Sequence, residues 1–181
     1  MSAAVTPGEV VAFWREAGYG KWFAGGAAFD AECREHFLEA HHAAARGEYE
    51  AWMGTAEGAL ALLLLLDQIP RNVFRGSGHA FATDGLARHY AAQAVQAQLD
   101  AQIEPALRAF LYLPFEHSED PADQRRSVEL FAGIGDESYD KYALAHQEVI
   151  ARFGRFPHRN RALGRENTAE EQAWLDAGGG F

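Results

Sequence analysis

Apolar residues recur at intervals of three and four along most of this chain, and no stretch shows sustained alternation with β-branched residues. The first pattern is typical of amphipathic helices, so we predict an all-α fold of about eight or nine helices. Capping boxes, N-cap residues and early prolines mark where the helices begin. The expected starts are Thr6, Asp30, Thr55, Ser77 or Thr83, Pro105, Asp120, Ser138 and Thr168. The expected ends lie near Ala17, Gly47, Pro70, Leu99, Leu111, Ala132 and Phe153.

The most apolar stretch runs from Ala59 to Leu66. A bilayer-spanning helix needs ~20 apolar residues, so this shorter run predicts a helix buried on all sides of a core. A glycine-rich connection is expected around Trp22 and Phe23. We predict one helical domain over residues 1–177 and a flexible glycine-rich tail at 178–181.

The 181 residues include 16 basic and 26 acidic side chains, giving a formal charge of −10. Such an acidic surface repels phosphate, so neither nucleic acid nor a membrane surface is expected as a partner. Cys33 is the only cysteine, and the start of the chain lacks the pattern of a secretory signal. We therefore expect a cytoplasmic protein without disulfides; homo-oligomerisation is left open.

A first polar cluster directly follows the apolar run. A lone charge is costly to bury, so Asp67 is expected to pair with a cation, Arg71 or Arg75. Gln68 and Asn72 lie between these residues in the sequence and could orient a ligand. The structural alternative is that the arginines only join the helix end to the following loop.

A second polar cluster precedes the helix expected at Asp120, which is the natural N-cap of that helix. His117 and Glu119 are not needed for capping and are therefore candidates for ligand binding or acid–base chemistry. Neighbouring side chains point apart, however, so residues adjacent in sequence seldom form a catalytic triad.

A third cluster spans residues 152–165. It contains five arginines, and no acidic residue lies between Glu148 and Glu166, so the segment carries a local charge of +5. Arginine suits bidentate recognition of carboxylate or phosphate, although exposed arginines can instead pair with the surplus acids. The candidate ligand-binding residues here are Arg155, His158, Arg159, Asn160 and Arg165.

The first and third clusters share a pattern, because Arg71-Asn72 and Arg159-Asn160 each follow a long helix and a proline. We expect the two loops to meet in space and form an arginine-lined pocket. Its ligand would be an anionic small molecule or the acidic end of a peptide.

Two other functions compete with this hypothesis. In the first, the protein is a hydrolase in which His117 or His158 is the base, assisted by Glu119 or Asp67, while an arginine stabilises negative charge. In the second, all three clusters are structural. The sequence does not decide whether the protein is an enzyme.

No metal and no cofactor are expected. His36, Glu39 and His42 share roughly one face of a helix, but the Glu-x-x-His motif of di-iron bundles occurs there without a second copy. The His-Glu-x-x-His zinc motif is absent from the sequence. Solvation at the protein surface explains these histidines better than a metal site does.

Taken together, the motifs resemble the bacterial domain-of-unknown-function family 924, and the similarity runs from about Val11 to Leu175. The resemblance implies stacked antiparallel helix pairs of the tetratricopeptide type, and it implies no known activity. Mild departures occur at Arg15 and Ile69, where the family pattern usually has Phe. The stretches that carry the resemblance are 29–30, 58–76, 80–84, 110–120, Gln124, His146, 152–165, Thr168 and Glu171.

Overall fold

The computed structural model describes residues 5–181, and every regular element within that range is helical. The all-α prediction is confirmed, while residues 1–4 of the predicted domain lie outside the described residues. The α-helices are α1 (Pro7–Ala24), α2 (Gly26–Ala45), α3 (Ala56–Leu63), α4 (Ile69–Val73), α5 (Asp84–Gln96), α6 (Pro105–Glu116), α7 (Pro121–Ala132), α8 (Glu137–Phe153) and α9 (Ala169–Asp176).

Several helices begin where local signals predict. In a capping box at the start of α1, Thr6 Oγ1 accepts from the backbone N–H of Glu9, whose carboxylate accepts from the N–H of Thr6. Asp120 caps α7 through a hydrogen bond of 2.7 Å from a backbone N–H. Thr168 and Glu171 form a second capping box at α9. These signals act within one turn of helix, so they do not depend on the rest of the fold.

The glycine-rich segment after the first helix is more helical than predicted. Gly18, with φ of 70°, breaks the regular geometry of α1, but the helix resumes and reaches Ala24. α2 begins at Gly26, so Asp30 lies inside a helix and the prediction that it is an N-cap was wrong. Its carboxylate instead accepts two hydrogen bonds from Arg75, at 2.7 and 2.8 Å.

The helix expected to end at or just before Pro70 runs past it to Val73. Proline lacks an N–H and clashes with the carbonyl four residues earlier, which normally breaks an α-helix. Here a π turn over Leu64–Gln68 widens the backbone before the proline. The hydroxyl of Thr83 donates to the carbonyl of Leu66 at 2.5 Å, replacing the bond that Pro70 cannot make.

Other helix ends also differ from the prediction. α6 continues through Pro114 to Glu116, beyond the end expected near Leu111, and residues 109–116 are all buried. α5 ends at Gln96, earlier than the end expected near Leu99. Packing of a buried face outweighs local propensity, so sequence signals alone misplace these ends.

The residues from Leu60 to Leu66 are each at most 1% exposed and form the centre of the core, as their apolar run predicts. α3 packs against α1, α5 and α6, and α2 packs against α4. From α5 to α8, consecutive helices pack on one another in chain order. This is a compact helical arrangement, whereas the tetratricopeptide-type pairing stays a prediction.

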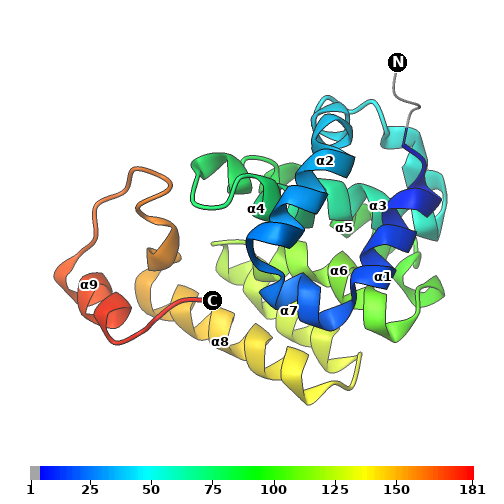
Figure 1. Cartoon of the computed structure of the whole chain (residues 1–181). Coiled ribbons are helices and arrows are strands. Elements are labelled where there is room, and N and C mark those ends of the chain that lie inside the picture. The colour runs from blue at the N-terminus through cyan, green and yellow to red at the C-terminus, as the bar shows by residue number, and fades with distance from the viewer. Residues whose placement is uncertain (1–4) are drawn as a thin grey trace.

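Figure 1 shows α1 and α2 on the face toward the viewer and α8 along the lower edge. The segment after α8 carries α9 beyond the end of the helical body, and the chain then returns so that its C-terminus lies near α8 (Figure 1). Among residues 5–181, no helix combines the length and apolar character needed to cross a membrane.

Candidate functional site

A cleft of about 900 Å³ lies between segments that are far apart in the sequence. Its walls come from the junction of α1 and α2, the π turn with α4, the C-terminal end of α6, one face of α8 and the turn at Pro157–Arg159. Small-molecule sites in proteins typically enclose roughly 300–1,000 Å³, so the cleft is large enough for a metabolite.

The cleft brings together residues of all three polar clusters. Asp67 lies behind the wall of the cleft and forms hydrogen bonds with two of the lining side chains, Gln68 and His117. The candidate residues that line the cleft are Gln68, Arg71, Asn72, Arg75, His117, His158 and Arg159. The segments that carry Arg71 and Arg159 therefore lie together in space, as the paired Arg-Asn motifs predict.

Asp67 is fully buried, and the π turn places it at the centre of a polar network. Its Oδ1 lies 2.7 Å from His117 Nδ1 and 3.3 Å from an Arg71 nitrogen, and its Oδ2 accepts from Gln68 at 2.7 Å. Burial alone would raise the pKa of Asp67, but Arg71 and His117 outweigh it and hold that pKa below its ordinary value. Asp67 is thus a buried carboxylate with three partners.

Arg71 and Arg159 share a second carboxylate, that of Asp84. Arg71 donates to both oxygens of Asp84, at 2.7 and 2.9 Å, and an Arg159 nitrogen lies 3.5 Å from one of them. Both guanidiniums lie over the ring of Phe81, at 5.5 and 4.6 Å from its centroid. Asp84 and Phe81 were not among the predicted site residues, although both belong to a motif that carries the family resemblance.

Arg159 is 6% exposed and incompletely paired. One terminal nitrogen donates to the carbonyl of His117 at 3.0 Å, while its buried Nε has no hydrogen-bond partner within residues 5–181. Desolvation and the neighbouring Arg71 lower the pKa of Arg159 to about 10, so the group remains charged at neutral pH. A buried cation with an unused donor is favourably placed for an anion.

The imidazole of His117 is held in one tautomer. Asp67 is a carboxylate and can only accept, so Nδ1 carries the proton and Nε2 carries the lone pair. Burial and Arg71 lower the pKa of His117 in spite of Asp67, which keeps the ring neutral at neutral pH. Within residues 5–181, no hydrogen bond to Nε2 is formed.

A second carboxyl–imidazole pair in the cleft was not predicted. Glu116 Oε1 lies 3.3 Å from Nδ1 of His146, which is 2.7 Å from the carbonyl of Tyr142. Burial and the charge of Asp67 raise the pKa of Glu116 to about 8, and burial lowers the pKa of His146 to about 3. Both groups are therefore uncharged near pH 7, and the contact is not an ion pair.

His158 is a third neutral imidazole in the cleft wall. Its Nδ1 is buried and finds no hydrogen-bond partner among the residues described, and burial together with Arg159 lowers the pKa of the ring to about 4.

The remaining four candidate residues do not line the cleft. Arg165 donates to both oxygens of Glu119, at 2.8 and 2.9 Å, and Arg155 donates to both oxygens of Glu171, at 2.6 and 2.8 Å. Asn160 is buried between Arg165 and Glu171. These pairs join the arginine-rich segment to α9 and to the connection between α6 and α7. The site therefore does not include Glu119, Arg155, Asn160 and Arg165.

Aromatic side chains complete the cleft, among them Tyr19, Trp22 and Tyr139. Phe181, from the tail expected to be flexible, stacks on His146 with ring centroids 3.6 Å apart and planes inclined by 14°. No local sequence signal distinguishes these aromatics from core residues, which explains why they were not predicted.

Comparisons with known proteins match nearly the whole chain. Residues 10–179 match the model of a family described as "Bacterial protein of unknown function (DUF924)". A solved structure of a protein of unknown function from Agrobacterium tumefaciens is 47% identical in sequence and superposes with a TM-score of 0.92. The match covers 94% of this chain and 97% of that one. No curated protein matches the sequence.

Proposed function

Because this chain belongs to the bacterial family of unknown function DUF924, whose description assigns no activity, we propose its function from the geometry of the cleft. The cleft binds an anionic small molecule, and the guanidinium of Arg159 is its principal anchor. The observation that carries this proposal is the buried Nε of a charged arginine, which has no hydrogen-bond partner among the described residues, in the wall of a large cleft.

The charge of the lining supports an anionic ligand. Lys21, Arg71, Arg75 and Arg159 line the cleft, and Glu116 is its single acidic lining residue among those the structure describes. Glu116 holds its proton at neutral pH because burial raises its pKa to about 8. Carboxylates that balance the arginines lie behind them rather than in the lining, so a ligand meets a positive surface inside an acidic protein.

A thermal-shift series with inorganic phosphate, citrate, succinate and a short acidic peptide tests this proposal. We expect at least one anion to stabilise the protein, by about 2.7 kcal/mol at one hundred times its dissociation constant. Arg159→Met keeps the apolar bulk of the side chain and should abolish the shift. Arg46→Met is the matched control, because Arg46 is an exposed arginine that does not line the cleft and is paired with Glu48.

Two results would overturn the proposal. One is a wild-type melting temperature that no member of the anion series changes. The other is an anion shift of full size in Arg159→Met. A response confined to the peptide would assign the cleft to an acidic chain end instead of a small molecule.

The pairing of His117 with Asp67 supports a second candidate function, hydrolysis of the bound anion. Of the bases and acids considered from sequence, Glu119 is engaged by Arg165, and His158 has no carboxylate partner in the described structure. In the hydrolytic scheme His117 Nε2 takes a proton from water as the water oxygen attacks a carbonyl or phosphoryl centre. Asp67 stabilises the imidazolium that forms, and Arg159 stabilises the negative charge on the electrophile until His117 returns the proton to the leaving group.

An activity screen with chromogenic carboxylic and phosphate esters distinguishes hydrolysis from binding alone. His117→Gln should remove turnover while leaving the anion-induced thermal shift in place. Because the pKa of His117 is lowered from 6.5, the rate should stay constant near neutrality and fall only below pH 6.5. Turnover that survives unchanged in His117→Gln would exclude this residue as the base.

A further inference from the structure

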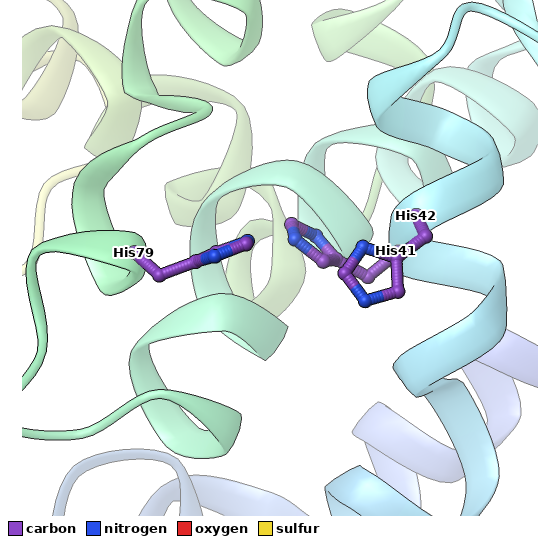
Figure 2. Close-up of side chains that lie close together, drawn as sticks. All are labelled: His41, His42 and His79. Carbon is purple, nitrogen blue, oxygen red and sulfur yellow. The ribbon is translucent and has the colours of Figure 1, made fainter.

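Three histidines outside the cleft lining come together between α2 and the turn at Gly78–Phe81. His41 and His42 are consecutive in α2, and His79 lies in the turn. One ring nitrogen from each lies within 4.8 Å of the others. Figure 2 shows the His79 side chain extending from the opposite side toward the two rings of α2.

His41 is the most informative member of this cluster. It is fully buried, and its Nδ1 lies 2.8 Å from the carbonyl of Leu65 in the π turn. A carbonyl accepts, so Nδ1 carries the proton and Nε2 carries a lone pair. That Nε2 is buried and has no hydrogen-bond partner in the part of the chain that the structure describes. An unsatisfied buried acceptor is costly, so its retention calls for an explanation.

The arrangement around His41 matches the environment of a metal-binding imidazole. Histidine ligands usually donate their second ring N–H to a backbone carbonyl or carboxylate, which fixes the tautomer and directs the lone pair to the metal. The Leu65 carbonyl has this role here.

We infer that His41, His42 and His79 form a binding site for one divalent transition-metal ion of the zinc class. Three imidazole ligands favour Zn²⁺, Co²⁺, Ni²⁺ or Cu²⁺ over Mg²⁺ and Ca²⁺, which prefer oxygen ligands. Three protein ligands also leave one position of a tetrahedral ion for water or another small ligand.

The present spacing requires an adjustment on binding. In a tetrahedral site with zinc–imidazole bonds of about 2.0–2.1 Å, two ligand nitrogens lie about 3.4 Å apart. The described nitrogens lie within 4.8 Å of one another, and rotation of the exposed His79 side chain brings its nitrogen closer to the other two. Phe74 stacks on His79 with centroids 3.9 Å apart, which already holds that ring beside the other two.

The sequence pattern pointed to other residues and predicted no metal site. It placed His36 and Glu39 with His42 on one helix face, whereas His36 packs against Phe13 with ring centroids 5.4 Å apart. The third ligand of the cluster, His79, comes from a different element. Only the folded chain brings it to α2, so the spacing of residues within α2 could not reveal it.

The experiment is a titration of tag-free, chelator-treated protein with Zn²⁺ by calorimetry and with Co²⁺ by visible absorption. We expect one ion per chain and the intense absorption of tetrahedral Co²⁺, with no binding of Mg²⁺. His79→Ala and His42→Ala should each weaken Zn²⁺ binding at least tenfold. His89→Ala is the matched control, because His89 is exposed on α5 outside the cluster, and it should bind Zn²⁺ as the wild type does.

Circular dichroism of the same variants distinguishes a loss of binding from a loss of folding. His79 is the primary substitution because it is exposed, whereas His41 is buried. Failure of wild-type protein to bind Zn²⁺ stoichiometrically would overturn the inference. So would equal Zn²⁺ affinity in His79→Ala and wild type. Neither result bears on the anion cleft, whose test uses Arg159→Met.

Discussion

Nδ1 of His117 lies 2.7 Å from Oδ1 of Asp67, although 50 positions separate the two residues in the sequence. The contact joins the end of α6 to the π turn that follows α3. It places the lone pair of the imidazole on Nε2, while burial and Arg71 lower the pKa of His117, and the ring lies in the same cleft wall as Arg159. The pair therefore contributes both to the stability of the core and to the chemistry that the cleft can perform.

Asp67→Asn should destabilise the protein strongly. The amide cannot balance the charge of Arg71, and removing one member of a buried ion pair typically costs roughly 3–5 kcal/mol. Urea unfolding followed by circular dichroism measures the change. Glu48→Gln, which removes an exposed partner of Arg46, is the control and should leave the unfolding midpoint unchanged. A loss below about 1 kcal/mol for Asp67→Asn would show that the network is not needed for stability.

Glu116→Gln should flatten the dependence of stability on pH above pH 6.5. The pKa of Glu116 is raised from 4.5 to about 8, so between these values the folded state keeps a proton that the unfolded state releases. Stability therefore falls as pH rises, by up to about 1.4 kcal/mol per pH unit from this group.

The difference between the wild-type and Glu116→Gln urea midpoints from pH 6.5 to 8 isolates this effect, because the lowered pKa values of His117, His146 and His158 influence both proteins alike. Glu137→Gln, at an exposed position in the first turn of α8, should keep the wild-type slope. A wild-type slope in Glu116→Gln would mean that Glu116 is ionised in the folded protein.

Two glycine substitutions should have opposite effects. A Cβ on Gly58 would lie 2.1 Å from the backbone carbonyl oxygen of Trp52, so Gly58→Ala should cost about 1–3 kcal/mol. Gly85 is exposed near the start of α5 and has open space around a Cβ, so Gly85→Ala should stabilise by about 0.5–1 kcal/mol. Thermal midpoints of the two variants measure the difference, and a stabilising Gly58→Ala would contradict the close approach of α3 to Trp52.

Phe181→Ala should raise the pKa of His146. Burial is the main cause of the low value of about 3, and the Phe181 ring covers the imidazole at a centroid distance of 3.6 Å. Its removal exposes the ring, and NMR titration should then detect a shift toward the ordinary value of 6.5. Phe23→Ala changes another exposed aromatic of the cleft and should leave the His146 titration where it is. An unchanged His146 pKa in Phe181→Ala would show that the tail does not cover it in solution.

Local signals were sufficient for the helix starts at Thr6, Asp120 and Thr168, because each cap is completed within one turn. They failed at Pro70 and Pro114, where proline normally ends a helix. At Pro70 the free carbonyl of Leu66 is satisfied by the hydroxyl of Thr83, and no pattern near the proline indicates that donor.

In the candidate site too, local signals predict some features and miss others. The paired Arg-Asn motifs correctly placed Arg71 and Arg159 in one cleft, because polar residues that interrupt apolar surroundings must find partners. They could not indicate that Arg165 would form an ion pair with Glu119. They also missed Glu116 and His146, whose importance arises only from burial.

The sequence by itself determined the helical class, the buried centre at Leu60–Leu66, most helix starts and the polar segments that gather at the cleft. Periodicity, caps and the cost of burying charge are local or statistical properties that every chain segment carries with it. Only the tertiary structure decided which arginines stay available, which carboxyl keeps its proton and which histidines meet. Those outcomes depend on distances between side chains from different helices, and such distances exist only after the chain has folded.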